Sequence, residues 1–350
     1  MKKSLIALAI ASAVSAPAAF AATSNVDVYG VLNMSLNFVD PDISGQDSSN
    51  PSVTSAGSRI GFKGAEDLGG GLSGIWQIES GINPDEQSGT LASRNSFLGL
   101  KGGWGTVLAG NHDTPMKLVG RMVDNFGDTL GDSRNLLGAD STGKTQFDLR
   151  TKNTIAYISP DFAGFQAVAA YVADWNANPA SGLDNNDYDA YSINGTYKNG
   201  PLMLGAAYED HNSAVSSQEA DMWRLVGGFD IAGFKLAALY ESMSGDGNNS
   251  RLSRDAYGLF GSYMLGAFNL KANYMSADSS DFGNDGADQW TVGADYNLSK
   301  RTRAYAYYAT VDNDGNAGYG LGAGAGASDQ TIGNNGSNPG SFGIGVAHSF

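Results

Sequence analysis

Residues 25–39, NVDVYGVLNMSLNFV, alternate apolar and polar side chains almost without a break. One set of alternate positions carries Val26, Val28, Gly30, Leu32, Met34, Leu36 and Phe38, and the other carries Asp27, Asn33, Ser35 and Asn37. A helix would scatter these residues around its circumference, whereas a strand places each set on one side. At about 3.3 Å per residue, a strand of this length crosses a bilayer at a tilt. The stretch therefore predicts a membrane-crossing β-strand with one apolar and one polar face.

Alternating stretches of this kind, each followed by Gly, Asn, Asp or Ser, recur to the end of the chain. Besides the first, we expect strands at 54–65, 71–82, 92–101, 104–111, 152–159, 164–174, 188–198, 201–210, 219–229, 233–243, 252–263, 266–276, 286–297, 301–311 and 340–350. That makes sixteen, an even number, as single-chain bacterial barrels have. The sequence therefore predicts an all-β fold, a transmembrane antiparallel β-barrel.

The expected connections alternate in length. Tight turns fall at Gly102-Gly103, Asn199-Gly200, Ala232-Gly233, Leu265-Gly266 and Ser299-Lys300, and longer polar loops at 174–187, 243–251, 276–286 and 312–339. Outer-membrane barrels have short turns on the periplasmic side and long loops outside. A soluble β-rich structure, which remains the alternative, has no reason to segregate its loops so regularly.

The composition favours a membrane barrel and argues against other classes. The chain has 48 Gly, 16 Tyr and 15 Phe, yet only 41% hydrophobic residues, as expected when one strand residue in two faces lipid. It contains no Cys, so it has neither disulfides nor thiol chemistry. The formal net charge of −15 argues against nucleic acid as a partner, because nucleic acid binding needs clustered positive charge.

The N-terminus has the pattern of a secretory signal peptide. Lys2 and Lys3 precede the apolar run LIALAIASAV at 5–14, and Ala19-Phe20-Ala21 supplies small residues at both positions of a cleavage site. The apolar run is too short for a spanning helix, which needs about 20 residues. We therefore expect a signal peptide over 1–21, with cleavage after Ala21, and a single barrel domain over 22–350.

A stretch at 111–151 interrupts the rhythm of strands. A connection of about 40 residues is usually functional or disordered rather than merely connecting. Its apolar side chains favour an ordered loop that folds inward and packs against other residues; they are Met116, Leu118, Val119, Met122, Phe126, Leu130, Leu136 and Leu137.

Five motifs spread along the chain are specific when they are taken together. They are VYG at 28–30, SRIGFKGAEDLGGGL at 58–72, RNSFLGL at 94–100 running into GTV at 105–107, NTIAYISPDFAGF at 153–165, and VAHSF at 346–350. In this order they resemble the first strand, the second strand, the segment before the third loop, the strand and turn after it, and the last strand of one family. That family is the trimeric general porins of Gram-negative outer membranes, of the neisserial and β-proteobacterial type.

The resemblance implies a sixteen-stranded barrel, a homotrimer in the outer membrane, and passive diffusion of small hydrophilic solutes and ions. It also implies that the third extracellular loop, about 111–151, folds into the lumen and narrows the pore. In the family the terminal Phe, here Phe350, is an assembly signal read by the barrel insertion machinery. An acidic outward surface would suit divalent cations that bridge it to anionic lipopolysaccharide.

The alternation predicts which basic side chains face the lumen. If Ile60 and Phe62 face lipid, then Arg59 and Lys63 face the lumen, because an Arg on the lipid face at mid-membrane would cost about 2–4 kcal/mol. The same argument points Phe97 and Gly99 outward and Arg94 and Ser96 inward. Two further basic residues lie where the long loop rejoins the barrel, Arg150 and, as the less favoured candidate, Lys152.

The family places a basic cluster on the wall that faces acids of the loop, and Arg59 and Arg94 fit positions in its motifs. The candidates for the acidic side are Asp113, Asp124, Asp128 and Asp132. A transverse field between two such clusters orders polar solutes and discriminates against apolar ones. The lumen cations favour a preference for anions, whereas the net acidity of the chain favours cations.

Two other classes of function remain as alternatives, an outer-membrane barrel enzyme and a secreted β-rich adhesin or binding module. The three histidines, His112, His211 and His348, are far apart in sequence and argue against a zinc site, and we expect no cofactor. No G-x-S-x-G elbow supports a catalytic triad. Residues 320–327, GLGAGAGA, lack a Lys and a following helix, so they predict a flexible outer loop rather than a phosphate-binding loop.

Overall fold

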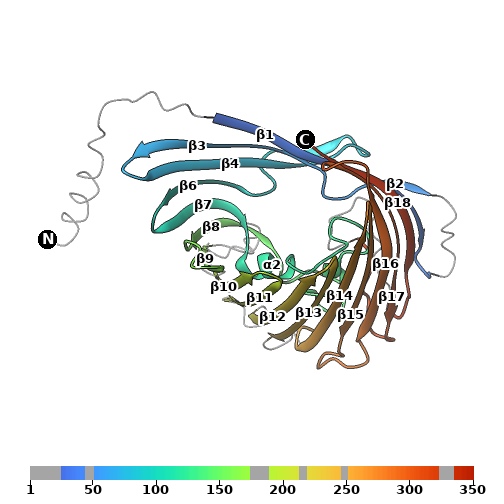
Figure 1. Cartoon of the computed structure of the whole chain (residues 1–350). Helices are drawn as coiled ribbons and strands as arrows, with labels where there is room; N and C mark the ends of the chain where they lie inside the picture. Colours follow the sequence, from blue (N-terminus) through green and yellow to red (C-terminus); the bar gives the residue numbers. More distant parts are fainter. Residues whose placement is uncertain (1–24, 44–50, 174–188, 213–218, 246–250, 323–334) are drawn as a thin grey trace.

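The chain folds into a closed antiparallel β-barrel (Figure 1). The computed structural model describes residues 25–43, 51–173, 189–212, 219–245, 251–322 and 335–350. The expected signal peptide, 1–21, lies outside the described residues. Among those that are described, no helix is long and apolar enough to cross a membrane.

The strands are β1 (Asn25–Asp40), β2 (Ser52–Ser55), β3 (Arg59–Gly69), β4 (Leu72–Asn83), β5 (Ser88–Thr90), β6 (Ser96–Gly102), β7 (Gly105–Asp113), β8 (Arg150–Ile158), β9 (Phe165–Val172), β10 (Ala190–Asn199), β11 (Leu202–His211), β12 (Ala220–Ile231), β13 (Phe234–Gly245), β14 (Arg254–Leu265), β15 (Phe268–Ala277), β16 (Ala287–Asn297), β17 (Thr302–Asn313) and β18 (Gly340–Ser349). A short α2 (Pro115–Gly120) and a 3-10 turn η1 (Ser133–Asn135) lie between β7 and β8.

These segments occupy 16 positions around the barrel, as the sequence predicts. Two barrel strands are each split, because β2 and β3 both pair with β1, and β5 and β6 both pair with β4. The first split falls at Gly57, whose φ of 68° turns the backbone out of a strand. Pairing of β1 with β18 closes the ring.

The alternation in the sequence becomes the two faces of the barrel wall. Leu32, Leu98 and Leu236 on the outward face are 40%, 70% and 63% exposed, as befits side chains that contact lipid. On β1, Asn33 and Asn37 point inward and are buried. A barrel of this size is too wide for its own wall side chains to fill. Another part of the chain must therefore cover the inward side chains that are buried.

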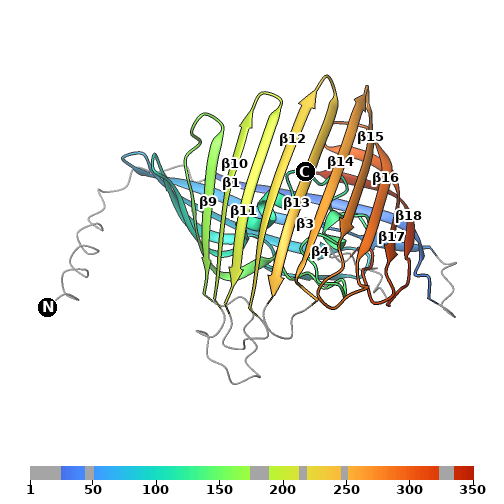
Figure 2. The ribbon, with the colours of Figure 1, turned by 90° about the horizontal axis from the view of Figure 1, so that it is seen from below.

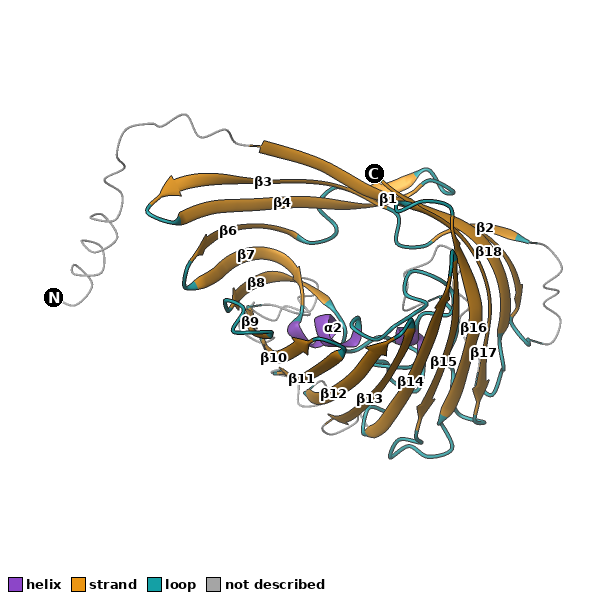
Figure 3. Ribbon diagram, in the orientation of Figure 1, coloured by secondary structure: helices purple, strands orange, loops and turns teal. Residues whose placement is uncertain are grey.

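That part is segment 114–149, the residues between β7 and β8. In Figures 1 and 3, α2 lies within the ring of strands. The apolar side chains of the segment and those of the wall form one cluster; from the segment come Met116, Val119, Val123, Phe126, Leu130, Leu136, Leu137 and Phe147, and from the wall Val226, Leu239, Met243, Phe260, Met275, Tyr305 and Tyr307. The main hydrophobic core therefore lies between this segment and the inner face of the strands.

The connections differ at the two ends of the barrel (Figure 2). Tight turns join β10 to β11, β12 to β13 and β14 to β15, with Gly200, Gly233 and Gly266 at positive φ. Such backbone angles suit glycine because it lacks a Cβ. Segment 114–149 follows β7 at the opposite end, among the longer connections.

Candidate pore constriction

Polar contacts with the inner wall fix the start of segment 114–149. Thr114 caps α2, its hydroxyl accepting a hydrogen bond from the Lys117 amide, and Pro115 occupies the first turn, where its missing N–H costs nothing. On β10, Asn194 Nδ2 donates to Pro115 O at 2.8 Å, and Ser192 Oγ accepts from the Met116 amide at 3.2 Å. The short helix is therefore tied to the wall at its N-terminus.

A cavity of about 370 Å³ remains between the segment and the wall residues just before β3, at the end of β4 and just before β6. Its lining includes five cationic side chains and two carboxylates, and these are Arg94, Lys117, Arg121, Arg134, Arg150, Asp128 and Asp148. Gly57, Ser58, Gly81, Asn83, Ser93, Thr145 and Leu149 complete it. The surface of the cavity is therefore polar and carries an excess of positive charge.

Asp128 connects the segment directly to the wall. Its Oδ2 lies 3.2 Å from Arg59 Nη1 on β3, and its Oδ1 lies 3.5 Å from Arg121 Nη2 within the segment. Asn33 Nδ2 on β1 donates to Asp128 O at 2.7 Å. Asp128 has a φ of 62°, an unusual backbone conformation for a residue other than glycine, and these contacts hold it there.

Arg94 contacts the wall rather than the acids of the segment. Its Nε lies 2.6 Å from Glu79 Oε1 on β4, and Glu79 Oε2 accepts a hydrogen bond from the Tyr29 hydroxyl at 2.9 Å. Glu79 therefore fixes the guanidinium of Arg94 at the edge of the cavity.

Asp113, at the end of β7, contacts two cations at once. Its Oδ1 lies 3.0 Å from Arg150 Nη2 on β8 and 3.2 Å from Lys117 Nζ. Asn95 Oδ1 accepts from Arg150 Nε at 2.8 Å. Burial lowers the pKa of Lys117 to about 8, although the carboxylate of Asp113 opposes the shift.

Asp132 is paired within the segment, whereas Asp124 also accepts a hydrogen bond from Asn273 Nδ2 on β15 at 3.1 Å. Arg134 donates to Asp132 through Nε at 2.9 Å and Nη2 at 2.6 Å, a bidentate pair. Burial alone would raise the pKa of Asp132, but the charge of Arg134 and its hydrogen bonds lower it. Asp124 accepts from the backbone amide of Phe126, and burial together with the nearby Asp132 raises its pKa to about 6.

The structure brings most of the predicted residues together, in a different arrangement from the one expected. Asp128 of the segment makes a direct ion pair with Arg59 of the wall, whereas Asp113, expected on the loop, is the last residue of β7 and pairs with Arg150. Lys63 is exposed on the inner wall, 5.2 Å from the centre of the Tyr29 ring, and does not line the cavity. Lys152 is also exposed and outside the cavity lining.

The predicted orientation of β6 is wrong by one residue. Leu98 is 70% exposed, whereas Phe97 faces inward, opposite Gln77, and packs beside Leu108. The prediction treated 92–101 as one continuous strand. The backbone between β5 and β6 is not a strand, so the alternation of faces on β6 does not extend back to Arg94. The ion pair with Glu79 positions the Arg94 side chain instead.

Three cations of the segment were not among the predicted site residues. Lys117, Arg121 and Arg134 line the cavity beside the wall residues Arg94 and Arg150. Only the acids of this stretch were considered from the sequence. Each of these cations lies close in the sequence to one of the acids Asp113, Asp128 and Asp132. This proximity could have indicated that the cations pair with the acids and belong to the same site.

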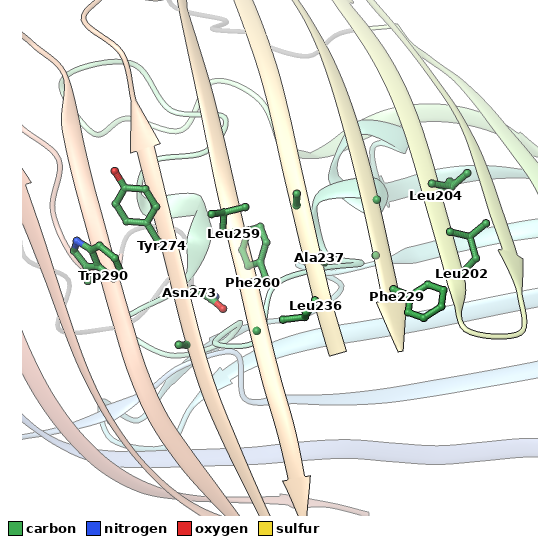
Figure 4. Close-up of a pocket in the computed structure, with 15 residues that line it drawn as sticks. Leu202, Leu204, Phe229, Leu236, Ala237, Leu259, Phe260, Asn273, Tyr274 and Trp290 are labelled. Atoms are coloured by element: carbon green, nitrogen blue, oxygen red, sulfur yellow. The ribbon is translucent and has the colours of Figure 1, made fainter. Parts of the chain in front are cut away.

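A larger hollow of about 770 Å³ lies on the wall across β11–β16 and is separate from this cavity (Figure 4). Leu204, Phe229, Leu236, Leu259 and Trp290 surround it, and these side chains belong to the outward face. An apolar hollow on the lipid-facing side offers no hydration to an ion. The polar cavity, not this hollow, has the chemistry of a solute path.

Comparison with known proteins agrees with this geometry. Residues 6–316 match the Gram-negative porin family. The chain is 31% identical over 340 residues to the major outer membrane protein P.IB of Neisseria gonorrhoeae, covering 87% of this chain and 92% of the relative. The corresponding protein of Neisseria meningitidis serogroup B is 30% identical over 323 residues, covering 87% and 91%.

A solved structure with a similar fold is the anion-selective porin from Comamonas acidovorans. Its TM-score is 0.77 at 26% sequence identity, covering 93% of this chain and 100% of that one. OmpT of Vibrio cholerae has a TM-score of 0.67 at 19% identity, covering 95% and 100%, which shows a shared fold. Because the family match extends over most of the sequence, the chain belongs to the Gram-negative porin family.

Proposed function

We propose that the cavity between segment 114–149 and the barrel wall is the narrowest part of a water-filled channel. As a porin of the outer membrane, the chain provides a path for small hydrophilic solutes and ions, and its family points to a channel rather than an enzyme. The observation that supports this position is the polar cavity itself, with charged side chains contributed by both the segment and the wall. In this proposal the segment is the third extracellular loop.

The charges at the cavity support a preference for anions. Five of the lining side chains are cationic and two are acidic. Each of the five cations also contacts a carboxylate, but of those carboxylates only Asp128 lines the cavity. Fixed charges close to an ion in a narrow, partly desolvated passage act more strongly than exposed loop charges, which salt screens. We therefore expect the cations of the lining, rather than the net charge of −15 on the whole chain, to set the preference.

Incorporation into planar lipid bilayers tests both statements. Stepwise conductance increments support a channel, and a reversal potential of the anion-selective sign in a KCl gradient supports the preference. A protein that inserts without conducting would contradict the channel, and one that does not insert would favour the secreted binding module. Conduction with a cation-selective reversal potential would refute only the preference for anions.

The family resemblance extends the proposal to assembly. We propose that the protein is a homotrimer, that the insertion machinery reads the terminal Phe350, and that divalent cations bridge its outer surface to lipopolysaccharide. Gly30 pairs with Phe350 through hydrogen bonds of 3.0 and 3.1 Å, so the last residue continues the ladder that closes the barrel. Native electrophoresis of the wild type and of Phe350→Ala tests the first two points, since the variant should give fewer trimers in the membrane.

Export is proposed from the N-terminal pattern. Removal of residues 1–21 would leave Ala22 as the first residue of the mature chain. N-terminal sequencing of protein from the outer membrane checks this, and an intact Met1 would contradict it.

A further inference from the structure

A second stretch of chain follows β17 at the end of the barrel where the longer connections lie, and its residues 317–322 are buried. Ala317, Tyr319 and Leu321 are all fully buried. The sequence predicted a flexible outer loop over 320–327. Residues 320–322 instead belong to the packed interior, and 323–327 lie outside the described residues.

This stretch bonds directly to segment 114–149. Gly318 N donates to Ser141 O at 2.8 Å, and Gly322 N donates to Leu130 O and to Asn135 Oδ1, both at 3.0 Å. The contact is close, since a Cβ added to Gly143 would lie 2.9 Å from Gly318 O. Small side chains thus let the two loops meet through their backbones.

The strand that precedes the stretch holds it in place. The side chain of Asn313, the last residue of β17, accepts from Tyr319 N at 3.1 Å and donates to Tyr319 O at 2.9 Å. The Tyr319 ring lies 5.6 Å from the Arg254 guanidinium, which also donates to Leu136 O at 2.7 Å and to Ala139 O. Tyr319 is therefore packed between the wall and segment 114–149.

Arg251, just before β14, connects two further loops to this contact. Its Nη1 donates to Ser141 Oγ at 3.1 Å and to Asn316 O at 3.3 Å. Its guanidinium stacks 3.7 Å from the centre of the Phe282 ring in the loop between β15 and β16. Four connections, each from a different part of the chain, thus meet at one place.

We infer that this loop junction, formed by Ser141, Arg251, Phe282, Asn316 and Tyr319, is a positioning element for the constriction. Arg134 lines the cavity, and Gly322 bonds Asn135, the next residue, and Leu130, four residues before Arg134. Gly322, at the end of the buried stretch, thereby holds the part of the segment that carries Arg134. The junction sets the width of the passage and the position of the Arg134 charge, an inference that rests on the proposed function.

Two substitutions at Tyr319 test the role of the junction. The Tyr319 hydroxyl has no hydrogen-bond partner in the described part of the chain, so Tyr319→Phe should conduct like the wild type. Tyr319→Ala removes the packed ring, and single-channel conductance should rise while the reversal potential shifts toward that of Arg134→Gln. Adding Arg134→Gln to Tyr319→Ala should then produce a smaller further shift than Arg134→Gln produces alone.

A folded Tyr319→Ala barrel with wild-type conductance and reversal potential would overturn the inference. The proposed function would survive that result, because the wild type would still conduct selectively. A wild type that does not conduct would instead contradict the proposed function.

A cross-link tests the geometry even if Tyr319→Ala fails to fold. Because the chain has no Cys, the double variant Ser141→Cys/Gly318→Cys contains one possible disulfide. Mild oxidation of the folded protein should form it, since the two backbones are already hydrogen-bonded. The pair Lys198→Cys/Ser141→Cys is the control and should not cross-link. No cross-link between 141 and 318 in the membrane would also overturn the inference.

Discussion

Arg224 on β12 and Asp148 near the end of segment 114–149 face each other through two parallel hydrogen bonds. Nη1 donates to Oδ1 at 2.6 Å and Nη2 donates to Oδ2 at 2.7 Å. Glu241 on β13 accepts from the same guanidinium at 2.9 and 2.6 Å, and Glu241 Oε1 accepts from Gly138 N. All three side chains are almost fully buried. One cation therefore ties the returning end of the segment to two neighbouring strands.

Replacing Arg224 with Leu should strongly destabilise the protein. The change leaves two buried carboxylates without their cation, which typically costs about 3–5 kcal/mol in the free energy of unfolding. Urea unfolding in detergent or lipid measures it. Arg303→Leu is the matched control, because Arg303 is partly exposed and its partner Asp295 keeps a second cation, Lys271; its cost should be about 0–1 kcal/mol. Equal losses for the two variants would contradict the special role of Arg224.

Removing Arg94, which lines the cavity, or Arg59, which pairs with the lining residue Asp128, should weaken the preference for anions. Arg59→Ser leaves Asp128 with Arg121 alone, and Arg94→Ser leaves Glu79 without its cation, so each variant removes a positive charge and leaves a carboxylate less well compensated. The reversal potential in a KCl gradient should shift toward the cation-selective sign. Lys144→Ser is the control, since Lys144 is exposed and does not line the cavity. If the Arg59 and Arg94 variants keep the wild-type potential, these residues do not belong to the constriction.

The preference for anions should fall between pH 7 and pH 9. Burial lowers the pKa of Lys117 to about 8, so its ammonium is mostly charged at pH 7 and mostly neutral at pH 9. Loss of this charge removes one of the five cations that line the cavity. Reversal potentials recorded across this range check the prediction. Lys117→Arg should abolish the pH dependence and keep the preference, whereas a Lys117→Arg channel that titrates like the wild type would assign the effect to another group.

A charge on the outward face of the wall should be costly. Leu259 lies near the middle of β14 and is 55% exposed on the face that contacts lipid. Leu259→Arg should lower the free energy of unfolding by about 2–4 kcal/mol when the position is at the bilayer midplane. Unfolding from liposomes measures the loss, and Leu259→Met serves as the control for shape. A variant as stable as this control would show that the face does not contact hydrocarbon.

The amino-acid sequence by itself determined the barrel and most of its strand positions. Alternation is a local property, because residues two apart on a strand share a face whatever the rest of the chain does. The stretch at 25–39 therefore gave the two faces of β1 directly, and the same period located the other strands to within a few residues. It also marked residues 111–151, which contain segment 114–149, as a long interruption whose apolar residues could pack in a core.

Only the tertiary structure decided how the charges pair. Asp128 meets Arg59 across 69 residues of sequence, and Arg224 meets Asp148 across 76 residues. Which charged residues pair depends on how the closed ring of strands brings distant parts of the chain together. A local sequence pattern contains no information about these distant contacts. Phe97 shows the same limit, because an irregular stretch before β6 shifted the alternation by one residue. The sequence specifies the wall through its period, while the contacts inside the wall arise only when the ring closes around the folded segment.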